Sequence, residues 1–205
     1  MYFGAGCFWH VQHEFVGEEV AALKRGPDQI TAISGYGGGL RTGDGGKVCY
    51  HNPRSIGDYG RLGHAEAVQV EIPQSALPRF SKKYFDLFGT RGMRHDPQDR
   101  GGEYRSVLGL PGGVDSPLFE TVKQAALDSP GGMKLYLGRG DEPDTIGDKA
   151  VLVYDSNKFP FYPGEVYHQF HNDFMGPAYG RVYNELQTKK IEAGVLKSTG
   201  CPDMI

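Results

Sequence analysis

A cysteine lies between glycines and large aromatic residues in "GAGCFWHVQH", residues 4–13. The apolar spacing after it predicts a helix that begins near Cys7 and ends near Gly17. A thiol in the first turn of a helix faces unpaired N–H groups and the positive end of the helix dipole, and both stabilise the thiolate. A protonated His10 would add to this effect. We therefore predict a reactive Cys7 with a lowered pKa, with a buried structural thiol as the alternative.

A second candidate group is the carboxyl of Glu66 in "GHAEAVQVEIP", residues 63–73. The strict alternation predicts a half-buried strand, on which Glu66 has the same parity as Val68 and Val70 and points to the apolar side. Burial raises the pKa of a carboxyl, and a carboxyl that is protonated near neutral pH can act as a general acid. If the strand begins only after Glu66, the residue is instead a solvated loop carboxylate.

Zinc ligation is a rival interpretation of the same region. The nitrogen and sulfur ligands available are Cys7, His10, His13, Cys49, His51 and His64. A zinc site needs three or four converging ligands, and residues at i and i+3 share a helix face whereas a residue at i+6 does not. We therefore predict neither a metal nor a cofactor, and we interpret His13 as a partly buried structural side chain.

These groups must be positioned by a mixed arrangement of strands and helices. The chain has 31 glycines, many of them between residues 35 and 63, where we expect a long functional loop. Strands are predicted at 1–3, 65–72, 105–111, 133–138 and 149–155, and helices at 77–88, 116–129, 164–174 and 179–194. Because these elements lack a regular βαβ order, we predict one α+β domain over residues 1–205, with a mixed sheet covered by helices.

Composition narrows the functional classes. A formal net charge of −3 without a basic cluster gives no reason to expect a nucleic-acid partner, and no apolar run approaches the length of a membrane span. Three cysteines, an odd number, argue against a secreted disulfide framework and suit a reducing compartment. Since we find no signal peptide, we expect a cytoplasmic location, and an organelle stays open if a leader has been removed.

Five ordered motifs resemble the A-type peptide methionine sulfoxide reductases. They are "GCFW", "GYGGG", "GHAEAVQVEI", "DRGGEYRS" and "FYPGEVYHQ", and the resemblance runs from about residue 2 to about residue 170. It implies a ferredoxin-like α+β plait with long loops and a C-terminal tail. It also implies thiol-dependent reduction of the S-epimer of methionine sulfoxide, free or within proteins.

The resemblance assigns roles to the residues around the cysteine. Cys7 matches the nucleophile, which attacks the sulfoxide sulfur and becomes a sulfenic acid. Phe8 and Trp9 match the aromatic residues that form a pocket for the substrate S-methyl group, as suits an apolar methyl. Asp99 matches an aspartate that holds this aromatic wall through hydrogen bonds.

The sulfoxide oxygen has its own set of matching residues. Glu66 matches the acid that protonates the departing oxygen, in agreement with its strand parity. Tyr104 matches a tyrosine that hydrogen-bonds that oxygen. A second such tyrosine lies in the loop before "GHAE" in the family, and here that loop is rebuilt. Our candidate is Tyr59, with Tyr50 and Tyr36 as alternatives.

Two departures from the family concern tuning and recycling. His10 replaces the usual glycine after "CFW" and could tune Cys7 or narrow the site. The sulfenic acid must be reduced, and the usual route is a second cysteine that forms a disulfide later opened by thioredoxin. We favour Cys201, in a tail expected to be mobile from about residue 194, over Cys49 in the glycine-rich loop.

Two other functions stay open at this point. The chain could be a non-catalytic protein that binds oxidised methionine in its partners, which altered loop tyrosines would favour. It could also be a redox sensor or thiol peroxidase that uses Cys7 with peroxide. The Phe8–Trp9 wall disfavours the last function, because peroxide needs no pocket for a methyl group.

Overall fold

A seven-stranded mixed sheet forms the centre of the protein, whose computed structural model describes residues 1–202. Its strands follow the spatial order β5-β6-β4-β1-β3-β2-β7. The β4–β6 and β5–β6 pairs are parallel, and the other pairs are antiparallel. The bounds are β1 Tyr2–Gly4, β2 Ile33–Gly37, β3 Ala65–Gln69, β4 Val107–Leu110, β5 Lys134–Leu137, β6 Ala150–Asp155 and β7 Tyr162–Pro163.

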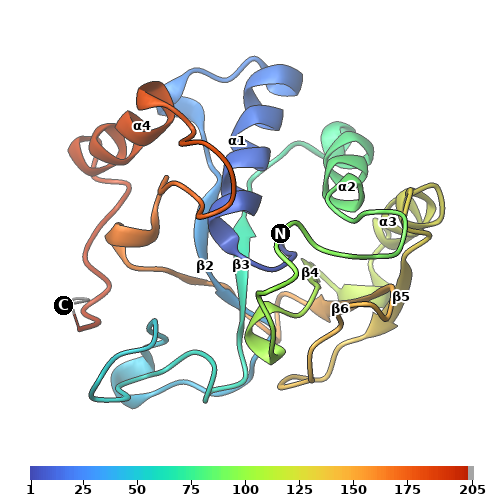
Figure 1. Ribbon diagram of the computed structural model, residues 1–205, viewed down its shortest axis with the longest axis horizontal. Coiled ribbons are helices and arrows are strands. Elements are labelled where there is room, and N and C mark those ends of the chain that lie inside the picture. The colour runs from blue at the N-terminus through green and yellow to red at the C-terminus, as the bar shows by residue number, and fades with distance from the viewer. Residues whose placement is uncertain (203–205) are drawn as a thin grey trace.

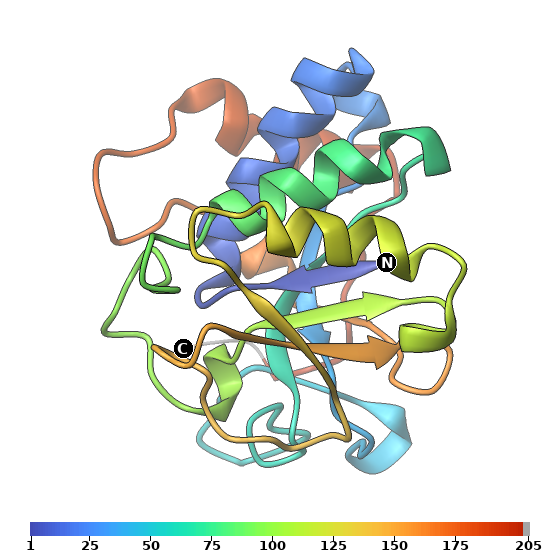
Figure 2. The same ribbon diagram turned by 90° about the vertical axis from the view of Figure 1, so that its right-hand side faces the viewer.

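Four α-helices accompany the sheet (Figure 1). They are α1 Phe8–Leu23, α2 Leu77–Asp86, α3 Phe119–Leu127 and α4 Arg181–Glu192. Figure 2 shows α1, α2 and α3 side by side on one face of the sheet. The α+β prediction, a mixed sheet covered by helices, is therefore confirmed, whereas the ferredoxin-like plait stays a prediction. None of the helices in residues 1–202 combines the length and the apolar character that a membrane crossing requires.

Side-chain alternation on β3 directs one carboxyl towards the helices. Val68 packs into the main core with side chains of α1 such as Phe15, whereas Ala65 and Ala67 pack in a smaller cluster of the sheet. Glu66 has the parity of Val68, and its carboxyl accepts a hydrogen bond from the first residue of α1. The strand prediction for this segment is confirmed from Ala65, although β3 ends at Gln69 rather than near residue 72.

Some sequence-based boundaries are wrong. The first helix does not end at Gly17 but continues to Leu23. A glycine inside a helix costs only about 1 kcal/mol. Burial of Phe15 and Val16, together with the bonds of the buried Glu19 carboxyl to Arg25 and Thr31, outweighs this cost. The helix predicted at 164–174 is only one 3₁₀ turn, Val166–His168, and the strand β2 was not predicted.

Candidate active site

Cys7 occupies the turn between β1 and α1, where it is the N-cap residue of the helix. Gly6 makes this turn possible, because its φ of 77° lies in a region that residues with a side chain seldom adopt. The Cys7 N–H donates a hydrogen bond to Asp99 Oδ2 at 3.2 Å. Cys7 is the free cysteine of the chain and is partly buried.

The electrostatic surroundings of Cys7 differ from the sequence-based prediction. Burial raises the pKa of Cys7 well above its ordinary value, and the nearby carboxyls of Glu66, Asp173 and Asp99 act in the same direction. The helix dipole and His10 were expected to lower this pKa, but desolvation and three acidic neighbours outweigh them. The resting sulfur is therefore a thiol at neutral pH.

Glu66 lies fully within the protein beside the start of α1. Its side chain accepts hydrogen bonds from the Phe8 N–H at 2.9 Å and from the Tyr59 hydroxyl at 3.2 Å. Burial raises the pKa of Glu66 to about 8, although the Phe8 and Tyr59 hydrogen bonds favour its ionised form. The predicted buried carboxyl that keeps its proton near neutrality is present, and it bonds the N–H of Phe8, the residue that follows Cys7.

Three tyrosines surround this carboxyl and divide into two kinds. Tyr59 is fully buried, and its hydroxyl is engaged by Glu66. Tyr104, in the 3₁₀ turn Gly102–Tyr104, and Tyr50, in the long loop, are only partly buried. Burial raises the pKa of Tyr50 and of Tyr104, and the negative charges that Glu66 and Cys7 can carry raise both pKa values further, so these two phenols lie within electrostatic reach of both reactive groups.

The aromatic wall extends beyond the two predicted residues. Phe8 is buried against His168, with ring centroids 5.1 Å apart, and Trp9 stacks on His171 at 4.2 Å. Phe174, which is 83% exposed, meets Trp9 edge-on at 5.1 Å. These contacts come from the segment before α4. No spacing signal in the sequence linked that segment to residues 8 and 9.

The predicted role of Asp99 needs correction. Its carboxylate accepts from the Cys7 N–H rather than from the aromatic wall, and the buried Trp9 Nε1 has no hydrogen-bond partner within residues 1–202. Asp99 is itself positioned by Arg94, whose guanidinium donates to the backbone oxygens of Asp99 and Tyr104 and pairs with Asp144. The structure thus attaches Asp99 to the nucleophile, and Arg94 is a positioning residue that the sequence did not disclose.

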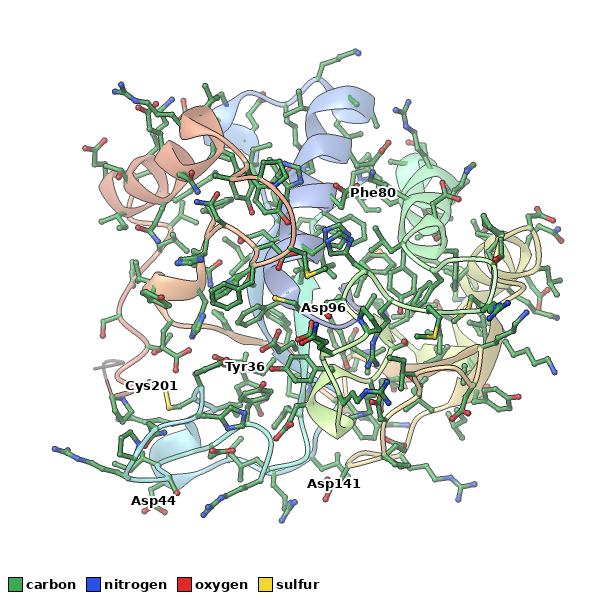
Figure 3. The ribbon with its side chains drawn as sticks, viewed as in Figure 1. Tyr36, Asp44, Phe80, Asp96, Asp141 and Cys201 are labelled. Atoms are coloured by element: carbon green, nitrogen blue, oxygen red, sulfur yellow. A yellow bond between two sulfur atoms is a disulfide. The ribbon has the colours of Figure 1, made fainter. Side chains whose placement is uncertain are left out.

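The two remaining cysteines are joined to each other. Cys201 forms a disulfide with Cys49, and Figure 3 shows Cys201 where the tail meets the loop. The tail is also held by a hydrogen bond from Lys47 Nζ to the Gly200 oxygen. Cys201 was expected to pair with Cys7, with Cys49 as the alternative partner of Cys7. Neither of these bonds is present in this structure, in which Cys7 is free.

This disulfide lies next to the site rather than far from it. Glu165 has a carboxylate oxygen within 4.8 Å of both sulfurs. The same carboxylate accepts from the Tyr50 N–H at 2.8 Å and from the Tyr36 hydroxyl at 2.6 Å. Tyr36 lies opposite Glu66 on the neighbouring strand, but its hydroxyl bonds Glu165 rather than Glu66, and it lies farther into the molecule than Cys201 (Figure 3).

The six nitrogen and sulfur ligands considered from the sequence do not converge in residues 1–202. His13 pairs with Glu14, His64 bonds the Arg41 oxygen, and His51 bonds Asp58. His10 stacks on His95, and burial lowers the pKa of His10 to about 4. A neutral His10 therefore cannot supply the positive charge that was expected beside Cys7.

Curated relatives of the chain carry one family name. The peptide methionine sulfoxide reductase MsrA of Geobacter sulfurreducens is 30% identical over 129 residues, which are 62% of this chain and 67% of the relative. The MsrA of Limosilactobacillus reuteri is 26% identical over 174 residues, 82% of this chain and 79% of the relative. MsrA 1 of Nostoc sp. is 32% identical over 52% of this chain and 56% of its own.

Solved structures and family models add the following. Mxr1 of Saccharomyces cerevisiae in reduced form aligns with a TM-score of 0.49 at 21% identity, over 82% of this chain and 80% of that one. Methionine sulfoxide reductase A of Corynebacterium diphtheriae aligns with a TM-score of 0.49 at 16% identity, over 98% and 76%. No family model matches the chain. Because the chain is 30% identical to the Geobacter relative over two thirds of that protein's length, it belongs to the peptide methionine sulfoxide reductase MsrA family of oxidoreductases.

Proposed function

We propose that the protein reduces the S-epimer of methionine sulfoxide, with Cys7 as nucleophile and Glu66 as general acid. One observation carries this proposal. Glu66 is buried, has a pKa of about 8 and hydrogen-bonds the N–H of the residue that follows Cys7. A sulfoxide oxygen cannot leave without a proton, and a protonated carboxyl beside a thiol supplies one.

The reaction transfers one oxygen from the substrate sulfur to Cys7. The oxygen would bind between Glu66 and the phenols of Tyr50 and Tyr104, while the S-methyl group packs against Phe8 and Trp9. Glu66 protonates the oxygen as the Cys7 sulfur bonds to the substrate sulfur. Transfer of the oxygen to Cys7 then releases the thioether as methionine, leaves Cys7 as a sulfenic acid, and lets the former thiol proton restore Glu66.

Recycling uses the other two cysteines in sequence. The Cys201 thiol attacks the Cys7 sulfenic acid, which forms a Cys7–Cys201 disulfide and releases water. The Cys49 thiolate then attacks Cys201, which frees Cys7 and forms the Cys49–Cys201 bond found in the structure. A dithiol reductant of the thioredoxin class reduces that bond and completes the cycle. Cys49 would thus be the second recycling cysteine.

Turnover of the separate sulfoxide epimers with dithiothreitol tests the reaction. We expect reduction of the S-epimer only, and none with Cys7→Ser, because a hydroxyl is a far weaker nucleophile at neutral pH. Hydrogen peroxide serves as the comparison substrate. Faster consumption of peroxide than of the S-epimer would favour a peroxidase, and binding of oxidised peptide without turnover would favour a non-catalytic protein.

Trapping of the disulfides tests the recycling step separately. With one equivalent of substrate and no reductant, peptide mapping of Cys49→Ser should give a Cys7–Cys201 bond. The wild type should give mainly Cys49–Cys201, starting from fully reduced protein. A Cys7–Cys49 bond in the wild type, formed before any other, would contradict the assignment of Cys201 as the first resolving cysteine.

A further inference from the structure

Three side chains beside Cys7 take no part in the proposed reaction. His10 comes from the first turn of α1, His95 from the segment between α2 and the turn at Tyr104, and Asp173 from the segment before α4. One ring nitrogen of each histidine and one oxygen of the carboxylate all lie within 4.8 Å of one another. In Figure 1 the segment before α4 passes across α1, which accounts for the meeting of residues so distant in sequence.

The spacing of the three groups is wider than hydrogen bonding requires. His10 Nδ1 lies 4.0 Å from Asp173 Oδ2, and His95 Nε2 lies 3.5 Å from the same oxygen. Ordinary N–H···O bonds are about 2.7–3.2 Å long. A tetrahedral zinc ion with bonds of about 2.0–2.2 Å holds its ligand atoms about 3.3 Å apart. Small side-chain movements would therefore bring the three atoms around one ion.

The two rings lie side by side, and at least one of them must tilt before both nitrogens can share one ion. The imidazoles of His10 and His95 are stacked, with centroids 3.8 Å apart and planes 8° from parallel. Each directs a nitrogen towards Asp173. The His95 side chain is 39% exposed and has room to tilt, whereas the His10 side chain, on the helix, is 15% exposed.

The Asp173 carboxyl is buried beside two histidines. Its side chain is 3% exposed, yet within residues 1–202 no lysine or arginine nitrogen lies within 4.0 Å of it. It accepts from the Met175 N–H at 3.3 Å and from the Tyr179 hydroxyl at 3.4 Å, both long contacts. Burial of an ionised carboxylate is costly unless a cation compensates it.

We propose that His10, His95 and Asp173 bind a divalent late first-row metal ion such as Zn²⁺. Two imidazoles and one carboxylate are a ligand set that such ions prefer, and three protein ligands leave a further position open. The ion would connect the first turn of α1 with the segments at 89–101 and 170–180. This inference concerns binding and does not depend on the proposed reductase activity.

Metal titration of the Cys7→Ser protein, with the Cys49–Cys201 disulfide intact, tests the site without competing thiols. We expect one equivalent of Zn²⁺ by calorimetry, and a visible absorption band of tetrahedral type with Co²⁺. His10→Ala, His95→Ala and Asp173→Asn should each weaken binding by at least about 100-fold, since loss of an outer-shell partner alone costs 10–100-fold.

The matched control is His51→Ala, which must leave binding unchanged. His51 lies 2.9 Å from Asp58 and 3.7 Å from Glu103, so it offers a histidine between carboxylates but no second histidine. Saturable binding that persists in all three ligand variants would show an adventitious ion only, and absence of saturable binding in the parent protein would overturn the proposal.

Hydrogen exchange gives a second readout that does not depend on affinity. Zn²⁺ should slow exchange of the amides at 170–180 in the parent protein and in His51→Ala. It should have no such effect in His10→Ala. Thermal unfolding of each variant without metal establishes that the variants are folded. Equal protection of this segment in His10→Ala would contradict the assignment of His10 as a ligand.

Discussion

At the scale of single residues, the raised pKa of Glu66 supports its proposed role as general acid and also lowers the stability of the folded protein. Its pKa of about 8 in the folded protein lies above the ordinary 4.5. Between these values the folded protein binds a proton that the unfolded chain has lost, so stability falls as the pH rises. A carboxyl suited to donate a proton near pH 7 is therefore one that the fold holds at the expense of stability.

Replacement of Glu66 separates these two effects. Glu66→Gln should slow reduction of the S-epimer by roughly 10²-fold or more, the scale of a lost general acid. The same variant should unfold at a higher temperature than the wild type at pH 8. This difference should narrow as the pH falls and vanish below pH 4.5, where the Glu66 carboxyl is neutral in the unfolded chain as well as in the folded protein. A constant gap across this range would mean that Glu66 is not the group that carries the raised pKa.

Tyr59 should set the pH at which activity declines. Its hydroxyl donates to Glu66 and favours the carboxylate, so Tyr59→Phe should raise the pKa of Glu66 further. Because the protonated carboxyl is the active form, the alkaline decline of kcat/KM should move to higher pH. Tyr36→Phe is the matched control, since the Tyr36 hydroxyl bonds Glu165 instead. An unmoved decline in Tyr59→Phe would argue against Glu66 as the acid.

At the scale of elements, the segment between α2 and β4 determines the geometry at Cys7. Arg94 is almost fully buried and joins Asp144 to the backbone at Asp99 and Tyr104. Asp99 in turn holds the Cys7 N–H. One guanidinium therefore positions residues on both sides of the reacting sulfur.

Substitution of Arg94 should affect stability and catalysis together. Lysine cannot reproduce the planar set of donors, so Arg94→Lys should destabilise the protein by about 3 kcal/mol, the lower end for a broken buried pair. We also expect a lower kcat, because Tyr104 and Asp99 lose their support. Arg91→Lys, an exposed change in the same segment, should alter neither quantity. Wild-type unfolding in denaturant with Arg94→Lys would refute the positioning role.

At the scale of the whole molecule, the Cys49–Cys201 bond connects the tail to the loop across 152 residues. Closing so long a loop restricts the unfolded chain and stabilises the folded protein by up to about 5 kcal/mol in the chain-entropy model. The bond also lies beside Glu165, which bonds the backbone of Tyr50. The oxidised tail is thus part of the support of the proposed oxygen-binding loop.

Loss of this bond should be visible in both stability and cycling. The Cys201→Ser substitution and chemical reduction of the disulfide in the wild type should lower the unfolding midpoint by equal amounts. Treatment of the variant with the same reductant should not lower its midpoint further. Cys201→Ser should also stop thioredoxin-driven turnover yet keep the first stoichiometric turnover. Undiminished cycling with thioredoxin would show that the tail cysteine has no role in recycling.

The local sequence contained much of the candidate site. The turn at Gly6 and the apolar spacing after Cys7 predicted the start of α1, and the alternation on β3 predicted a buried Glu66. Both are short-range features, because a glycine turn and a two-residue period depend only on neighbouring residues. The end of α1 was misplaced at Gly17, since packing against the sheet is not visible in a local pattern.

Only the tertiary structure decided the environment and the partners of these groups. Burial raises the pKa of Cys7, and carboxyls from distant segments raise it further. Together these effects outweigh the lowering of the pKa expected from the helix terminus. The partner of Cys201 is Cys49 and the partner of Asp99 is the Cys7 amide, and both depend on how long loops pack. The cluster of His10, His95 and Asp173 has the same origin. Its members come from three segments that are far apart in the sequence and meet only in the folded protein.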